Sequence, residues 1–117
     1  MSRLYQENAV GDLVLLDEVS QQLMTKTLED RFKLDLIYTY IGNVLISVNP
    51  FRMIDGMYAV EKVDLYKDRY MYENVPHIFA LAEDTYRALK RDKEDQCIII
   101  TGESGSGKTV RLKYASY

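Results

Sequence analysis

The chain has 117 residues, of which 47% are hydrophobic and 28% are charged, a composition that is ordinary for one globular domain. Its formal net charge of −3 excludes a general electrostatic attraction to nucleic acid or to an anionic membrane surface. A single cysteine excludes an internal disulfide framework and suits a reducing compartment. Charges interrupt every apolar stretch well before the length of a membrane span, so the sequence predicts a soluble intracellular protein without a transmembrane segment.

The first half of the chain predicts an N-terminal arm, a helix and a β-hairpin. Residues 1–9 form the polar arm, and from Asp17 to Phe32 apolar residues recur at helical spacing. β-branched and aromatic residues flank Gly42-Asn43, which predicts strands over 36–41 and 44–48 and a positive φ at Gly42 in the turn between them. Because both strands are apolar at nearly every residue, we expect both of their faces to be covered.

The second half predicts helices around one further strand. A short helix is expected over 59–67, and a longer one follows Asn74-Val75-Pro76 and ends near Arg91. His77 is expected to act as a residue of the helix start. The apolar run 97–101 predicts a strand that buries Cys97, and 107–117 predicts a final helix. This order predicts an α/β fold: a hairpin, a strand leading into a loop, and flanking helices.

The loop after the last predicted strand is a complete phosphate-binding motif, G-x-x-x-x-G-K-[ST]. Glycines let the backbone curl so that successive amide N–H groups point at an anion, and a following helix directs its positive dipole end to the same place. The lysine would reach the outer phosphates and the threonine hydroxyl would ligate Mg²⁺. The motif predicts a site for a nucleoside polyphosphate with Mg²⁺, in a P-loop NTPase, formed by Gly102, Glu103, Ser104, Gly105, Ser106, Gly107, Lys108 and Thr109.

The position of this motif near the end of the chain predicts an incomplete domain. A phosphate-loop ATPase needs further strands that supply an acidic Mg²⁺-holding residue and a group to position water. The strand over 97–101 is apolar on both faces and would have only the hairpin beside it, so one of its edges would stand open. We therefore expect residues 10–117 to be part of a larger domain that is truncated just after the loop.

Blocks of sequence along the chain resemble the N-terminal part of a myosin motor head, and class I (single-headed, unconventional) myosins most closely. Residues 11–16 are similar to the opening of a class I head. Residues 37–51 resemble the myosin hairpin that leads into the purine-binding loop, and residues 76–82 the helix before the phosphate strand. Residues 95–109 resemble the phosphate loop with its strand, and serine at position 106 favours class I.

The resemblance implies an actin-activated ATPase motor of the cytoplasmic actin cytoskeleton, with ATP, Mg²⁺ and actin filaments as its ligands and partners. It implies that Asn49 and Pro50 begin the loop under the adenine and that Tyr58 is the tyrosine of that loop. Tyr58 lies one residue further from Asn49 than the family pattern places it, so a packing tyrosine is an equal alternative. For Asn49 the alternative is a turn-forming role.

The sequence departs from the family pattern again after the phosphate loop. Myosins typically have Glu-Ala-Ser-Lys where this chain has Val110-Arg111-Leu112-Lys113. Arg111 and Leu112 therefore replace two small residues, alanine and serine, with large ones. The switch segments and the actin-binding cleft are not in these residues, so we expect no motor activity from them alone and assign no catalytic residue. Two alternatives stay open: a small phosphate-loop kinase or GTPase, and a non-catalytic interaction fragment.

Overall fold

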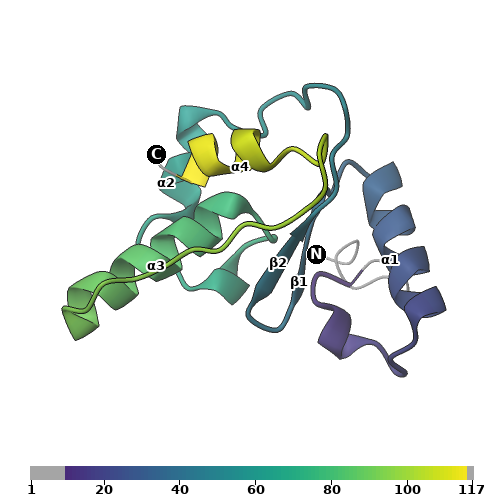
Figure 1. Cartoon of the computed structure of the whole chain (residues 1–117), viewed down its shortest axis with the longest axis horizontal. Helices are drawn as coiled ribbons and strands as arrows, with labels where there is room; N and C mark the ends of the chain where they lie inside the picture. Colours follow the sequence, from purple (N-terminus) through teal and green to yellow (C-terminus); the bar gives the residue numbers. More distant parts are fainter. Residues whose placement is uncertain (1–9, 116–117) are drawn as a thin grey trace. The chain divides into compact units, whose positions relative to one another are not determined.

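The computed structural model describes residues 10–115 (Figure 1). It divides into two compact units, one ending at Ile54 and the other beginning at Asp55, and each is described by itself. The predicted arm over residues 1–9 lies outside the described residues. No helix within 10–115 is long and apolar enough to cross a lipid bilayer.

The first unit contains the predicted hairpin. The 3-10 helix η2 (Leu13–Leu15) and the helix α1 (Gln21–Lys33) precede the strands β1 (Tyr38–Ile41) and β2 (Val44–Ser47). The strands pair antiparallel, with Tyr38 opposite Ser47. Gly42 has φ +58° in the turn, as predicted, because that conformation carries no steric penalty in a residue without a Cβ.

The two strands differ in burial. The residues of β1 from Tyr38 to Tyr40 are buried, whereas those of β2 are half-buried or exposed. The prediction that both strands are covered therefore holds for β1 only. On the other edge of β1, the Tyr40 amide donates to the Gly11 carbonyl at 2.9 Å, and the Asp12 carboxylate accepts from the Gly42 amide at 3.2 Å. The segment before α1 thus covers an edge that the hairpin alone would leave open.

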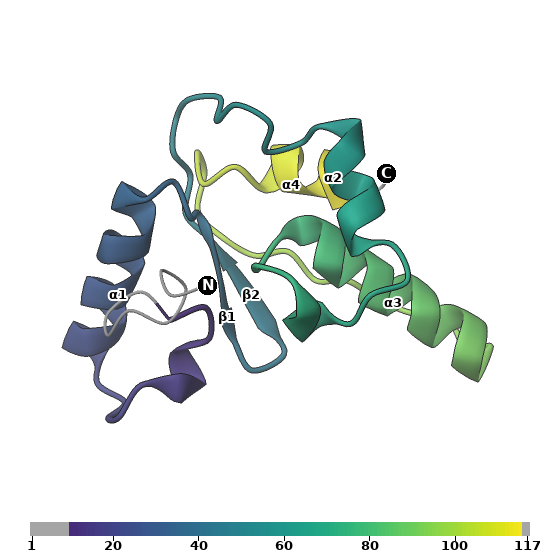
Figure 2. The same ribbon diagram turned by 180° about the vertical axis from the view of Figure 1, so that it is seen from behind.

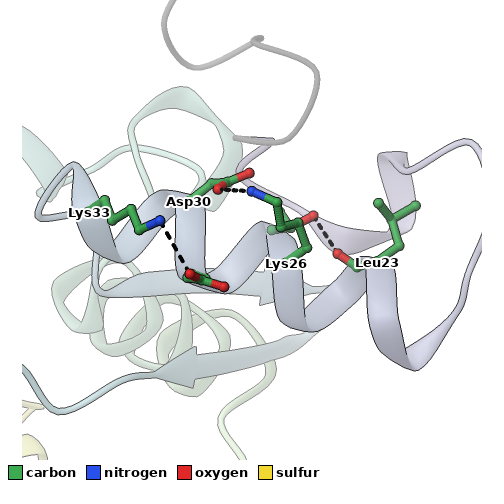
Figure 3. A network of polar contacts seen from close by, with 6 residues as sticks. Leu23, Lys26, Asp30 and Lys33 are labelled. Carbon is green, nitrogen blue, oxygen red and sulfur yellow. Dashed lines mark hydrogen bonds and ion pairs between the residues drawn. The ribbon is translucent and has the colours of Figure 1, made fainter.

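Helix α1 begins later than its apolar spacing predicts. Ser20 is the N-cap, and its hydroxyl accepts from the Leu23 amide at 3.1 Å, so the helix begins at Gln21 rather than near Asp17. Figure 3 shows the polar contacts along this helix: two ion pairs at i,i+4 spacing and the Thr27 hydroxyl donating to the Leu23 carbonyl. The ion pairs join Lys26 to Asp30 at 2.6 Å and Lys33 to Glu29 at 3.2 Å.

The most deeply buried residues of α1 are polar, whereas Leu23, Met24 and Leu28 of the predicted apolar stripe are half-buried. The buried residues are Thr27 and Arg31, while Phe32 is 38% exposed. Arg31 Nε donates to Thr39 Oγ1 and Arg31 Nη2 to the Tyr38 carbonyl, both at 2.8 Å. Burial lowers the pKa of Arg31 from its ordinary value. One guanidinium therefore joins α1 to β1 by hydrogen bonds, a role that periodicity of apolar residues does not detect.

The second unit is helical. It contains α2 (Val60–Tyr66), the 3-10 helix η3 (Met71–Glu73), α3 (Ile78–Asp92) and α4 (Lys108–Ala115). Helix α3 packs against α2 and α4 (Figure 2). His77 is the N-cap of α3, as predicted for a helix-start residue, so Pro76 lies before the helix and not in its first turn. The helix ends at Asp92, one residue later than expected, with Lys93 in the left-handed conformation at φ +55°.

The strand predicted over 97–101 is absent. Within residues 10–115 the sheet consists of β1 and β2 only, and residues 93–103 run back along α3 as irregular chain (Figures 1 and 2). Ile99 is 85% exposed, and Cys97 is exposed rather than buried as predicted. A strand requires a neighbour for its backbone N–H and C=O groups, and the described residues offer none to this segment. The apolar residues of this segment favour a strand, but without a neighbour to pair with it the segment is irregular.

Candidate functional site

Residues 102–107 form a turn between the irregular segment and α4. The Ser106 amide donates to the Glu103 carbonyl at 3.1 Å and closes the turn. Gly105 and Gly107 have φ of +83° and +92°, a region that side chains rarely adopt. Glycine at these positions lets the backbone reverse sharply immediately before the first turn of the helix.

Gly102 and Ser106 approach one another closely across this turn. A Cβ atom added at Gly102 would lie 2.6 Å from Ser106 Oγ and 3.3 Å from Ser106 Cβ, so no larger residue fits without a shift. Ser106 Oγ is itself buried and has no hydrogen-bond partner among the described residues. A buried hydroxyl of this kind can donate to an oxygen acceptor beside the turn, and an anionic phosphate oxygen is one such acceptor.

Lys108 and Thr109 begin α4, and both side chains are exposed. The Arg111 amide donates to the Gly107 carbonyl at 3.1 Å in the first turn of the helix. The Lys108 ammonium donates to the Gly102 carbonyl, so its charge lies against the loop while the side chain stays exposed. One short segment thus carries an ammonium, the hydroxyls of Ser106 and Thr109 and the N-terminus of a helix, a donor set that fits a polyphosphate with its Mg²⁺.

The residues expected under the adenine belong to different units. Asn49 and Pro50 lie in the first unit, where Asn49 Oδ1 accepts from the Phe51 amide at 2.9 Å. This side-chain turn over Pro50 is the turn-forming role that was the alternative for Asn49. Phe51 follows with φ +54° and is 82% exposed.

Tyr58 lies in the second unit and belongs to a group of side chains that we call the His77 cluster. Its ring stacks on Tyr114 of α4 with a centroid distance of 3.7 Å and an interplanar angle of 2°. It also meets His77 and Phe79 edge-on, at 5.6 and 6.2 Å between centroids. Tyr58 therefore has a packing role, which does not exclude a further contact with a ligand. The cluster consists of Met57, Tyr58, Tyr66, His77, Phe79 and Tyr114.

His77 is the polar centre of the cluster and is 1% exposed. Burial lowers its pKa to about 4, and the positive charges of Lys62 and Arg111 act in the same direction, while the hydrogen bond to the Met57 carbonyl opposes them. The imidazole is therefore neutral at pH 7. Sequence reasoning identified His77 only as a helix-start residue and gave no role to Tyr114, because neither lies in a motif and their contacts join distant parts of the chain.

Comparison with known proteins gives a consistent result across the chain. Residues 10–116 match the family described as myosin head (motor domain). Myosin IC heavy chain of Acanthamoeba castellanii is 48% identical over 107 residues, which cover 92% of this chain and 9% of that protein. Human unconventional myosin-Ib is 52% identical over 104 residues, 89% of this chain and 9% of that protein. Chicken (Gallus gallus) unconventional myosin-Ia is 52% identical over 105 residues, 90% and 10% respectively.

Proposed function

Because the chain belongs to the myosin motor-domain family, we propose that it is the ATP-binding N-terminal segment of an actin-based motor, with Gly102–Thr109 as its phosphate loop. The observation that carries this proposal is the turn at residues 102–107, which leads directly into the N-terminus of α4 with Lys108 and Thr109 in the first turn. The chain spans about a tenth of the length of the relatives it matches. Actin-activated ATP hydrolysis is accordingly proposed for the complete head and not for these residues alone.

Each residue of the loop has a distinct part in this proposal. The amides of residues 104–109 would cradle the phosphates, with the Ser106 amide exchanging its hydrogen bond to the Glu103 carbonyl, and the Lys108 ammonium would move from the Gly102 carbonyl to the outer phosphate oxygens. The Ser106 hydroxyl donates to a phosphate oxygen, which would satisfy the buried atom. Thr109 holds Mg²⁺, which supplies charge neutralisation at the phosphates. Asn49, Pro50 and Tyr58 lie on the adenine side in this proposal, as the family resemblance implies.

The proposal is tested by isothermal titration of the chain with MgATP, using a matched pair of lysine variants on α4. We expect Lys108→Ala to weaken binding at least about tenfold, because a charge-assisted hydrogen bond to phosphate is lost. Lys113→Ala removes the same charge from the same helix outside the loop, so its affinity should equal that of the wild type. Equal affinities for all three proteins, or no binding by the wild type, would overturn the proposal.

A non-catalytic interaction fragment is the second candidate, and one observation favours it. The segment 97–101 carries an 85% exposed Ile99 and no strand partner among the described residues, which is typical of a surface that another chain covers. A thermal melt separates the candidates. An upward shift with MgATP in the wild type but not in Lys108→Ala supports the nucleotide-binding segment, because a ligand of the folded state raises its stability. Family membership disfavours the phosphate-loop kinase or GTPase alternative.

A further inference from the structure

The two ring nitrogens of His77 join distant segments of the second unit. Nδ1 accepts from the Phe79 amide at 3.0 Å and so caps α3. Nε2 lies 2.8 Å from the Met57 carbonyl, which can only accept. These partners require the neutral tautomer with its proton on Nε2. One buried imidazole therefore fixes both the start of α3 and the backbone of the segment before α2.

The Met57 carbonyl lies next to the ring that contacts α4. Met57 is buried, and Tyr58 follows it directly, so a hydrogen bond on Met57 limits where the Tyr58 ring can lie. That ring stacks on Tyr114 with near-parallel planes at 3.7 Å. Stacked aromatic pairs favour one relative orientation over others, so the contact with Tyr58 fixes the orientation of α4 in addition to covering the Tyr114 ring.

Helix α4 connects Tyr114 to the phosphate loop without interruption, because it begins at Lys108 and ends at Ala115. Its one buried residue is Arg111, and the loop before it is exposed except for half-buried Ser106 and Gly107. Hydrogen bonds within the loop, from the Ser106 amide to the Glu103 carbonyl and from Lys108 to the Gly102 carbonyl, fix its local shape rather than its position on the rest of the unit. The position of Lys108 and Thr109 therefore depends on how α4 is seated, which involves buried Arg111 as well as Tyr114 at its far end.

We infer that His77 is a positioning residue for the phosphate loop, acting through Met57, Tyr58 and Tyr114 on the orientation of α4. This inference rests on the proposed nucleotide-binding function of the loop. It assigns His77 no contact with a ligand. It also gives Tyr58 a role at the phosphate end of the site, through packing, whether or not its ring touches a base.

The decisive variant is His77→Asn. Asparagine is a good N-cap, so it retains the cap of α3, but its shorter side chain cannot reach the Met57 carbonyl. We expect His77→Asn to bind MgATP and magnesium tripolyphosphate about tenfold more weakly than the wild type, and to similar extents, since the loss acts through the phosphate loop. Tyr114→Leu should have the same effect. The double variant should be no weaker than the weaker single variant, because both substitutions break one connection.

A control variant in the first unit tests whether a loss of stability alone could lower the affinity. Arg31→Lys removes buried hydrogen bonds there and should lower the melting temperature without changing either affinity. All titrations are made well below the lowest melting temperature. Wild-type affinity in His77→Asn, additive effects in the double variant, or a loss confined to ATP would overturn the inference.

A measurement without ligand keeps this inference separate from the proposed function. In amide NMR spectra of the ligand-free chain, His77→Asn should shift the resonances of Lys108 and Thr109, whereas Arg31→Lys should leave them in place. If the wild type binds neither ligand but these resonances shift, the proposed function fails and the connection from His77 to the loop stands. Unshifted resonances would overturn the inference whatever the chain binds.

Discussion

The phosphate loop and the His77 cluster lie in the same unit but are built in opposite ways. The loop is mostly exposed, and its shape follows from glycines at positive φ and one turn hydrogen bond between Ser106 and Glu103. The cluster is centred on a side chain that is 1% exposed and has hydrogen bonds at both ring nitrogens. The part that would meet a ligand is thus shaped by local backbone chemistry, while the part that supports it is shaped by packing between distant segments.

The largest expected effect comes from protonating the cluster. The pKa of His77 is about 4 in the folded chain and 6.5 in the unfolded one, so the unfolded chain binds a proton first as the pH falls. Stability is complete above pH 6.5 and decreases toward pH 4, by up to about 3 kcal/mol for this shift. Urea unfolding at several pH values measures it. His77→Asn should show a shallower slope over this window, and parallel slopes would contradict the assignment.

The next largest effect is expected from a substitution that distorts the phosphate loop and leaves the His77 cluster intact. Gly102→Ala places a Cβ 2.6 Å from Ser106 Oγ, so either the Ser106 hydroxyl or the turn must shift. We expect MgATP affinity to fall by about tenfold or more, with little change in melting temperature because the loop is exposed. Ser106→Ala removes the closest atom and leaves Ser106 Cβ at 3.3 Å, but it also removes the hydroxyl proposed to donate to a phosphate oxygen. Gly102→Ala should therefore lower the affinity less in the Ser106→Ala background than in the wild type. Equal losses in the two backgrounds would show that this contact is not the cause.

A smaller effect tests one hydrogen bond at the edge of the cluster. The Tyr66 hydroxyl donates to the Val75 carbonyl at 2.7 Å, and its ring lies 5.2 Å from that of His77. Tyr66→Phe keeps the ring and removes this bond, so the free energy of unfolding should fall by about 1 kcal/mol. Chemical denaturation measures the change. A loss of several kcal/mol would mean that the hydroxyl, rather than the ring packing, holds this edge together.

The smallest effect is expected at an exposed contact in the other unit. Lys26 and Asp30 form an ion pair on the outer face of α1, and the hydrogen bond with Asp30 raises the pKa of Lys26 (Figure 3). Water screens exposed pairs of this kind, so Lys26→Met should leave the melting temperature unchanged within error. A resolvable decrease in low salt that disappears in high salt would show that the pair contributes more than exposed pairs usually do.

Much of the local structure was predictable from the sequence. The hairpin turn at Gly42, the short helix α2, the helix-start role of His77 and the helix after the phosphate motif all match prediction. Each depends on residues close together in the chain, namely a glycine at a turn, a cap or a glycine-rich loop before a helix. The motif at 102–109 also identified the candidate site, and its role in binding stays a prediction that the titration tests.

The tertiary structure alone decided what is buried and what is paired. The buried Arg31, the tautomer of His77 and the stack of Tyr58 on Tyr114 each require a partner far away in sequence. The apolar run 97–101 has the composition of a buried strand, yet Ile99 is 85% exposed and Cys97 is exposed. Composition and spacing describe what a segment can bury, whereas burial and pairing depend on the surfaces that the rest of the chain brings to it.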